Sequence, residues 1–562
     1  MLDNLIEFSL RQRILVLLLT LLIIGLGWRA LQNTPIDAYP DISKPQVKVI
    51  IKAPGMTPEE VEARITNRIE VEMRGIPNVV IMRSTTKYAV TDITIDFAEG
   101  TDIYWARNQV NERMSRLTAD LPDGISGGVA PLTTPLGEMF MFTIEGGALS
   151  LMERRELLDW TIRPLLRGVS GVADVNALGG EVRSYTVIPR PESMQRLGIG
   201  INDLVQAVRS NNRNAGAGRV QVGEETLLVR TLGSVTDLQD LRNIVVRPDP
   251  KEPVRIGDIA ELRFAGLTRY GGVTRDGQQE AVEGLVLGLR GANARAVVAG
   301  VKEKLAEIAS ALPEGVSIRV FYDRGKLVDT AVATVTNALL QAVVLVIILL
   351  VLFLADWRAA AVVATVLPLA ALMTFIAMQL TGLSANLMSL GGLTIAIGLL
   401  VDSSIVVIEN ISSRMRERGS DKLPKLHIIY RASSEVAVPV TAGVAIIVIV
   451  FMPLLSLQGL EGKLFRPVAQ TLIYALISAL LLALMLMPVL ASLLLRSDRN
   501  QSETSMMQSL GRHYQGLLKR SMNAHRTMLL AAAAMLGLTL VLFVLVGKIF
   551  MPTMDEGDII VQ

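Results

Sequence analysis

The sequence predicts a polytopic α-helical membrane protein with a large α+β block of split βαβ, ferredoxin-like units inserted after its first membrane helix. Three observations predict this fold class. Long apolar runs recur along the chain, a mixed block occupies residues 33–330, and 51% of residues are hydrophobic while only 19% are charged. Soluble domains average about 25% charged residues, so this composition points toward the membrane and away from disorder.

The composition also excludes several classes of function. Lys and Arg total 55 against 53 Asp and Glu, so the net charge of +2 lacks the basic excess of a nucleic-acid-binding domain. The absence of cysteine excludes disulfides, cysteine-ligated zinc, iron–sulfur clusters and thiol catalysis. The sequence has no P-loop, nucleophile-elbow or zinc-protease motif, so neither ATP nor an enzyme reaction is indicated.

Seven apolar runs predict seven membrane helices. They span residues 14–31, 335–354, 359–380, 386–411, 437–456, 467–495 and 527–547. Most are long enough to cross ~30 Å of hydrocarbon, and membrane helices tolerate the prolines inside them. The first run follows Arg11 and Arg13 and is also typical of a signal-peptide core. However, Trp28 and Arg29 follow it in place of a small-residue cleavage site, which favours an uncleaved helix.

The charges of the connecting loops predict the orientation in the membrane. Residues 412–435 and 496–526 are rich in Lys and Arg, whereas the connection between the fifth and sixth runs has only Lys463 and Arg466. Short basic loops remain on the cytoplasmic side. We therefore expect residues 33–330 on the outer side of the membrane.

The order of strands and helices repeats within the outer block. Residues 46–97 predict strand, helix, strand and strand, and residues 138–178 repeat the first three elements. Residues 280–322 supply the strands and helix that complete the second unit, so an inserted subdomain at 181–271 separates its two parts. The Asn- and Gly-rich stretch at 211–219 predicts an exposed loop or hairpin tip.

These patterns divide the chain into consecutive segments. They are a first membrane helix (1–32), a first α+β subdomain (33–131), a second in two parts (132–180 and 272–330), the inserted subdomain (181–271), membrane helices two to six (331–495), a cytoplasmic connection (496–526), a seventh helix (527–548) and a last segment (549–562). The last segment repeats an earlier one, because Pro552 and Asp558 lie 517 residues after Pro35 and Asp41. We expect a second copy of the block to begin there and stop at Gln562, so that the chain is half of a larger protein.

Two acids and a methionine lie on one stripe of the fourth apolar run. Asp402 lies inside the run, and Glu409 follows seven residues later, within about 20° of the same helical face. Met388 precedes Asp402 by fourteen residues and falls near that face, about 21 Å away along the axis. A carboxylate at the centre of a membrane helix costs about 2.5–3.5 kcal/mol, so such residues usually face a bundle interior or a water path.

The stripe has a functional and a structural interpretation. A carboxyl group whose hydration changes also changes its proton affinity, which is what a proton relay requires. We interpret Asp402 and Glu409 as proton-relay candidates and Met388 as a metal-ligand candidate. In the structural interpretation, Asp402 forms a static ion pair with another helix, Glu409 reaches the cytoplasmic interface, and Met388 only packs.

Other residues carry weaker signals. Histidine ligation of a metal is not favoured, because all three histidines fall in predicted cytoplasmic loops; they are His427, His513 and His525. Small residues around the central acid permit close contact between helices. They are Gly391, Gly392, Gly398, Ser403 and Ser404.

Several motifs carry a resemblance to a known family. Residues 37–41 read DAYPD, residues 54–62 read PGMTPEEVE, residues 241–246 read LRNIVV, residues 396–410 read AIGLLVDSSIVVIEN, and residues 551–558 read MPTMDEGD. With the order of helices and blocks, they resemble the resistance–nodulation–division (RND) permeases. Within that superfamily, the chain is most similar to the N-terminal half of the heavy-metal efflux (Cus/Czc-type) branch.

The resemblance implies a homotrimer in the bacterial inner membrane that binds a periplasmic adaptor (membrane fusion protein) and an outer-membrane channel, and no nucleic acid. The two α+β units would be porter subdomains, and residues 181–271 the docking subdomain. Such permeases are proton antiporters with no catalytic residues and no cofactors. Asp402 occupies the family's proton-relay position, Glu409 is the second acid of the motif, and Met388 falls where copper and silver exporters have a relay methionine.

The resemblance leaves the transported cation open. Zinc, cobalt and cadmium exporters have an additional acid six residues before the central Asp, where this sequence has Ala396, so Cu(I) or Ag(I) is slightly favoured. Thioether ligands suit Cu(I). Ser403 and Ser404 point the other way, because they replace a small apolar pair of copper and silver exporters. The lysine partner of the central Asp and the family's methionine cluster are expected beyond residue 562.

Two further functions are alternatives to metal export. One is an RND pump for drugs or other organic molecules. The other is a membrane assembly module or an inactive half-protein. A metal-resistance and drug-susceptibility panel distinguishes metal export from drug export. The downstream DNA distinguishes a pump from the third function, because an open frame of similar length that encodes a second set of helices would support a pump, whereas a stop after residue 562 would favour the inactive or assembly form.

Overall fold

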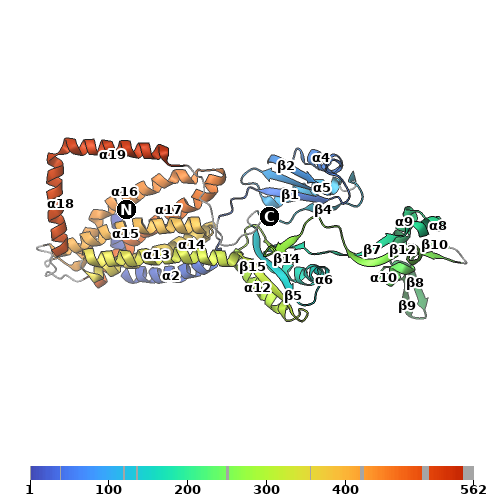
Figure 1. Ribbon diagram of the computed structural model, residues 1–562. Coiled ribbons are helices and arrows are strands. Elements are labelled where there is room, and N and C mark those ends of the chain that lie inside the picture. Colours follow the sequence, from blue (N-terminus) through green and yellow to red (C-terminus); the bar gives the residue numbers. More distant parts are fainter. Residues whose placement is uncertain are drawn as a thin grey trace. The chain divides into compact units, whose positions relative to one another are not determined.

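A computed structural model describes residues 2–37, 40–117, 120–134, 137–248, 252–354, 356–417, 423–495 and 505–547 (Figure 1). The chain forms two compact units. The first comprises Met1–Met139, Leu287–Gly300 and Tyr322–Gln562, and the second comprises Phe140–Val286 and Val301–Phe321. The membrane helices and one β-sheet belong to the first unit.

Seven of the described helices are long and apolar enough to cross a membrane. They are α2 (Arg13–Asn33), α13 (Arg324–Leu354), α14 (Trp357–Thr381), α15 (Leu387–Arg416), α16 (Lys425–Leu455), α17 (Gly459–Leu494) and α19 (His525–Leu545). Each coincides with one of the seven apolar runs, which confirms the predicted polytopic fold. Several extend beyond the apolar run because polar residues cap them; the Asp356 side chain, for example, accepts from the backbone N of Arg358 at 2.9 Å at the start of α14.

Helix α17 lies at the centre of the helix bundle. It packs against α14, α15 and α16, and two thirds (67%) of the residues in its most apolar 18-residue stretch are buried. The shared core is aliphatic, with Leu367, Ala396, Ile408, Leu472 and Met487 all at most 2% exposed. The short helix α1 (Leu2–Arg11) packs on α16 and α17 through Ile6, and the sequence patterns did not predict it as a separate element.

A glycine allows α15 to approach α17 closely. A Cβ atom on Gly392 would lie 2.7 Å from the backbone oxygen of Val468 on α17, inside van der Waals contact. The neighbouring Gly391 faces open space, with nothing within 4 Å of the same position. Of the two adjacent glycines, only Gly392 therefore serves the close helix contact that small residues permit.

The first unit also contains a four-stranded sheet, whose strands lie between α2 and β5 in the sequence. Its strands are β1 (Gln46–Lys52), β2 (Val79–Lys87), β3 (Val90–Phe97) and β4 (Ser126–Val129), in the order β2-β3-β1-β4 with antiparallel pairings. The helical segments α3 (Pro58–Val61), η1 (Glu62–Thr66), α4 (Asn67–Met73) and α5 (Ile103–Leu117) supply the rest of its hydrophobic core. Thr57 and Glu60 form a capping box that starts the first of these helical segments.

The second unit contains the split sheet that the sequence predicts. Its strands are β5 (Glu138–Gly146), β6 (Val172–Gly179), β13 (Val273–Arg275), β14 (Gln279–Gly288) and β15 (Val316–Asp323). The order is β13-β14-β5-β15, and β6 also pairs with β14. Strands from before and after the inserted segment therefore share one sheet. Its helices are α6 (Leu151–Leu157), η3 (Leu158–Ile162), α7 (Arg163–Arg167) and α12 (Ala294–Ala309).

The inserted segment forms a small subdomain with its own core. The antiparallel strands β7 (Arg183–Pro189) and β12 (Ala260–Gly266) form a ribbon that leads into it. Its other elements are α8 (Pro191–Leu197), α9 (Ile201–Asn211), β8 (Ala215–Val222), β9 (Glu225–Thr231), α10 (Leu238–Asn243), β10 (Val245–Arg247), β11 (Val254–Arg255) and α11 (Ile256–Ile259). Apolar side chains of α8, α9, α10 and α11 meet in this core.

The prediction of a loop or hairpin tip at 211–219 is wrong in position. Residue 211 ends α9, residues 215–222 form strand β8, and the hairpin turn follows at Gly223. The β-branched and aliphatic residues of β9 pair with β8 along its length, which outweighs the local preference of glycine for turns. Gly218 has a φ of +102° beside a register shift, so it accommodates a bulge.

Helix α18 (Ser505–Asn523) occupies part of the predicted cytoplasmic connection, where the sequence patterns predicted only a loop. Its apolar residues are interspersed with Arg512, Lys519 and Arg520, so it forms no continuous apolar run. The predicted start of a second block at 549–562 lies outside the described residues.

We expect Gly392→Ala to destabilise the protein, because the added methyl group would collide with the α17 backbone and push the two helices apart. The matched change Gly391→Ala meets nothing within 4 Å, and it replaces glycine by the better helix former. Thermal unfolding of the detergent-purified variants measures both effects. Equal melting temperatures for the two variants would show that the close contact does not matter.

Candidate functional site

All three candidate residues lie on α15, and two of them lie on a face that is exposed. Asp402 and Glu409 are exposed, in line with Ile395 (56% exposed) and Val406 (41% exposed). The opposite face, which includes Ile408, is buried in the helix bundle. The spacing of seven residues therefore places both acids on one stripe, as predicted, and the described helices do not cover that stripe. We call it the acidic stripe.

Neither acid has a partner within the described part of the chain. Asp402 and Glu409 form no hydrogen bond and no ion pair with any described residue. A static ion pair for Asp402, the structural alternative, would therefore require a basic group from outside these residues. The two carboxyl groups are about 10.5 Å apart along the axis, so a proton that moves between them needs water or another group in between.

The sequence predicts the N-terminal end of α15 on the outer side of the membrane, and we name the two ends of this helix outer and inner accordingly. The outer end is fixed by a buried cap. The Asn386 side chain accepts from the backbone N of Ser389 at 2.9 Å, and the Ser389 hydroxyl accepts from the backbone N of Asn386 at 2.9 Å. Both residues are at most 1% exposed. Met388 lies in this first turn and is half-buried. Its thioether is therefore held at the outer end of the helix that carries the acids.

The inner end of α15 is joined to α16 by a polar cluster that the sequence did not predict. Arg414 contacts both carboxylate oxygens of Glu435, with Nη2–Oε1 at 2.6 Å and Nε–Oε2 at 3.1 Å. The Asn410 side-chain amide donates to the backbone oxygen of Ala432 at 2.8 Å. Asn410 directly follows Glu409 in the motif, so the helix is fixed where the second acid lies. The usable sequence signal was an isolated acid, Glu435, at the end of a basic loop.

The small residues near Asp402 have different roles. Gly392 contacts α17, whereas a Cβ atom on Gly398 would meet nothing within 4 Å. Gly398 is exposed one turn before Asp402, so no described side chain covers the Gly398 backbone beside the acid. Ser404 is 1% exposed and faces the bundle. The acid is therefore accessible from its own face and firmly packed behind.

The described residues contain no cluster of three or more His, Asp or Glu side chains placed to hold a metal ion. The histidines were predicted in loops, and this is wrong. His427 lies in α16, His513 lies in α18, and His525 begins α19. Apolar runs mark only the hydrocarbon-spanning part of a helix, so the polar extensions of α16 and α19 and the amphipathic α18 were not predicted.

Comparisons with known proteins agree over nearly the whole chain. The model of the AcrB/AcrD/AcrF family matches residues 5–562. The cobalt-zinc-cadmium resistance protein CzcA of Cupriavidus metallidurans is 38% identical over 577 residues, covering 100% of this chain and 54% of that protein. The cation efflux system protein CusA of Escherichia coli is 34% identical over 573 residues, with coverage of 100% and 54%.

A solved structure supports the same relationship. The crystal structure of a heavy metal efflux pump superposes with a TM-score of 0.86 at 33% identity, and the match covers 98% of this chain and 53% of that chain. The chain thus spans about half the length of the curated relatives it matches. Sequence, family model and fold agree on one conclusion: the chain belongs to the AcrB/AcrD/AcrF family of RND transporters, and its relatives include heavy-metal efflux proteins.

Proposed function

We propose that this protein takes part in proton-driven export of heavy-metal cations from the bacterial inner membrane. The acidic stripe carries the proposal. Asp402 and Glu409 lie on one exposed face of α15, a helix that is capped at its outer end and bound to α16 at its inner end. A helix that is held at both ends, and whose two carboxyl groups no described residue contacts, offers protons a defined site.

The physical basis for coupling is the cost of a charged carboxylate in a membrane. Export would proceed through states in which the acidic stripe is alternately hydrated and covered. Covering the stripe favours the neutral, protonated carboxyl group, and hydration favours the carboxylate. A basic side chain that approaches Asp402 in one state would release its proton there. Each cycle would therefore move protons down their gradient.

Thioether chemistry makes Cu(I) or Ag(I) the first candidate for the cation. The chain has no cysteine, and Met388 is held at the outer end of the acid-bearing helix. Sulfur ligands without charge suit soft monovalent cations. Cobalt, zinc and cadmium are the second candidate, because the relative named for resistance to these metals shares more residues with this chain than CusA does.

The same proposal includes partners. A homotrimer would use the first sheet and the split sheet as porter subdomains, and the inserted subdomain at 181–271 would bind a periplasmic adaptor and an outer-membrane channel. Every residue of β9 is exposed, so the β8–β9 hairpin offers unpartnered surface for such contacts. No cofactor is proposed; the proton gradient supplies the energy and the metal is the substrate.

We predict that Asp402→Asn abolishes metal resistance in cells that express the protein from its own gene. The amide has the same shape as the carboxyl group but takes up no proton at physiological pH. Growth over a series of metal concentrations measures the effect, and membrane abundance is measured alongside. The matched control is Glu417→Gln, an acid at the C-terminus of the same helix that contacts Arg414 at 3.0 Å, and it should retain resistance. Full resistance in Asp402→Asn would contradict the relay assignment.

We predict that Met388→Leu lowers resistance to copper and silver while leaving protein abundance unchanged. Leucine has a similar volume, so only the thioether is lost. Met378→Leu is the matched control, because Met378 is fully buried on α14 and only packs. A panel of copper, silver, zinc, cobalt and cadmium measures the change. Resistance confined to the three divalent metals and unaffected by Met388→Leu would favour the second candidate, and resistance to organic compounds alone would exclude metal export.

A further inference from the structure

The segment that connects α2 to β1 contacts elements from four other parts of the first unit. Its described parts are residues 34–37 and 40–45, which we call the linker. The linker follows the first membrane helix directly and leads into the first sheet.

Backbone hydrogen bonds join the linker to the outer end of α15. The backbone N of Ala385 donates to the oxygen of Pro35 at 2.9 Å, and the backbone N of Asp37 donates to the oxygen of Ala385 at 3.1 Å. Ile36 and Ala385 thus form a parallel β-bridge. Ala385 immediately precedes Asn386, the cap of α15, so the linker is bonded to the end of the helix that carries the acidic stripe.

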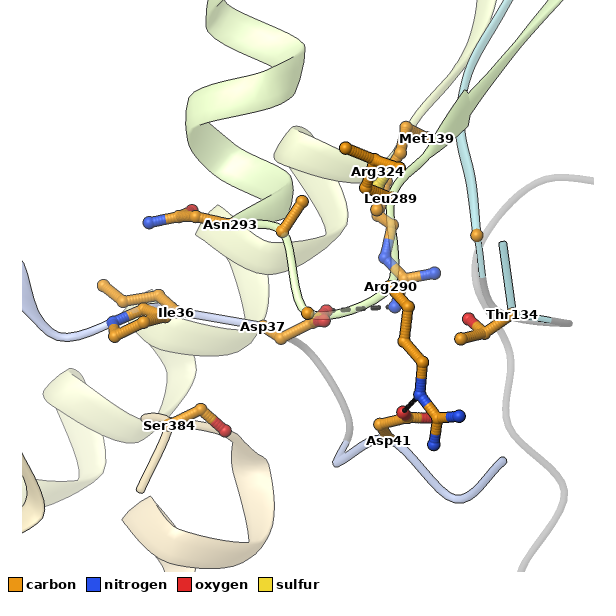
Figure 2. Close-up of a pocket in the computed structure, with 14 residues that line it drawn as sticks. Ile36, Asp37, Asp41, Thr134, Met139, Leu289, Arg290, Asn293, Arg324 and Ser384 are labelled. Atoms are coloured by element: carbon orange, nitrogen blue, oxygen red, sulfur yellow. Dashed lines mark hydrogen bonds and ion pairs between the residues drawn. The ribbon is translucent and has the colours of Figure 1, made fainter. Parts of the chain in front are cut away.

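Two arginines hold the linker from the other side (Figure 2). Arg324 Nη2 lies 3.0 Å from Asp37 Oδ1, and the Arg324 side chain is only 6% exposed. Arg290 Nε lies 2.9 Å from Asp41 Oδ2, and its Nη2 donates to the backbone oxygen of Ser43 at 3.0 Å. Arg324 begins α13 directly after β15, and Arg290 lies two residues after β14 ends. Each arginine therefore lies at the point in the chain where a strand of the split sheet ends and the first unit continues.

A third cation joins the same segment to α17. Lys463 Nζ donates to the backbone oxygen of Ser43 at 2.6 Å and lies 3.1 Å from a carboxylate oxygen of Glu99. Ser43 accepts from both Lys463 and Arg290 through one carbonyl. The linker is thus held to the outer ends of α13, α15 and α17 by polar contacts.

A cavity of about 110 Å³ lies beside the two arginine–aspartate ion pairs. The side chains that line it include Asp37, Asp41, Arg290, Arg324 and Met139 (Figure 2). Each aspartate is paired with an arginine, so the cavity offers no free carboxylate to a cation.

We propose that Arg290 and Arg324 are positioning residues for transport. Their ion pairs hold the linker, so that a displacement of the outer end of α15 is passed through the linker to the loop after β14 and to the end of β15. The inference rests on the proposed function, because it assumes that α15 carries the proton-dependent change. Coupling between distant sites requires a continuous chain of contacts. Here that chain runs from the α15 cap through Ala385, the linker and the two ion pairs.

We predict that Arg290→Gln lowers the maximal rate of metal export while metal binding and folding persist. Glutamine reaches fewer acceptors and carries no charge, so Asp41 and Ser43 lose their shared donor. The matched control is Arg295→Gln, five residues after Arg290 in the sequence. It breaks an exposed ion pair between Arg295 and Asp329 (3.0 Å). In reconstituted vesicles, maximal transport should fall for Arg290→Gln alone, with the half-saturating metal concentration unchanged, and Arg290→Lys should recover part of the rate.

A disulfide between the linker and the residue before the α15 cap tests whether these two segments move together. Because the natural chain has no cysteine, the double variant Ile36→Cys/Ala385→Cys gives a single defined disulfide across the β-bridge. If the linker and the α15 cap move together, the oxidised protein keeps its transport rate. Thr186→Cys/Arg263→Cys, a facing pair on β7 and β12, controls for oxidation itself.

The results separate the two proposals. If the unmodified protein exports no metal, the proposed function fails. If the unmodified protein exports metal and Arg290→Gln exports it equally well, the positioning role is overturned. Transport that stops when the Ile36–Ala385 disulfide forms and returns on reduction also overturns it, because the two segments would then have to separate.

Discussion

A carboxyl group inside a membrane helix must face protein or water, and the rest of this structure depends on how α15 meets that constraint. Exposure of such a charge to hydrocarbon costs about 2.5–3.5 kcal/mol. Asp402 and Glu409 nevertheless lie together on the uncovered face of the helix. Their position is stable only if that face meets water, a basic partner or a proton, and each of these is a state that a transport cycle uses.

The surrounding structure holds this helix in place. Gly392 allows α15 to lie directly against the backbone of α17, the most buried helix of the bundle. The Asn386 cap fixes the outer end, and the pairing of Arg414 with Glu435 fixes the inner end. Because each end is bonded to a neighbouring segment, a displacement of α15 would also move the residues that its ends contact. The linker contacts of Ala385 give that shift a route toward the α+β block.

Much of this arrangement was predictable from sequence periodicity. The apolar runs gave the seven membrane helices, and the spacing of Asp402 and Glu409 gave their common face. The split sheet followed from two strand–helix–strand patterns separated by an insertion. These features depend on residues close together in the chain, where the helix and strand periods act directly.

Contacts between distant residues were not predictable. Arg290 and Asp41 are 249 residues apart, and Arg324 and Asp37 are 287 residues apart, so no local pattern pairs them. The β8–β9 hairpin was misplaced because strand pairing overrode the glycine signal at Gly218. Glu435 was missed because an acid in a mainly basic loop resembles an ordinary solvated charge.

Proton movement in vesicles containing the purified protein tests the central claim most directly. A pH-sensitive dye inside the vesicles reports protons while metal is added under an imposed proton gradient. The account predicts metal-dependent proton flux in the wild-type protein and none in Asp402→Asn. Metal transport that is unaffected by collapse of the proton gradient, or equal proton flux in Asp402→Asn, would contradict it.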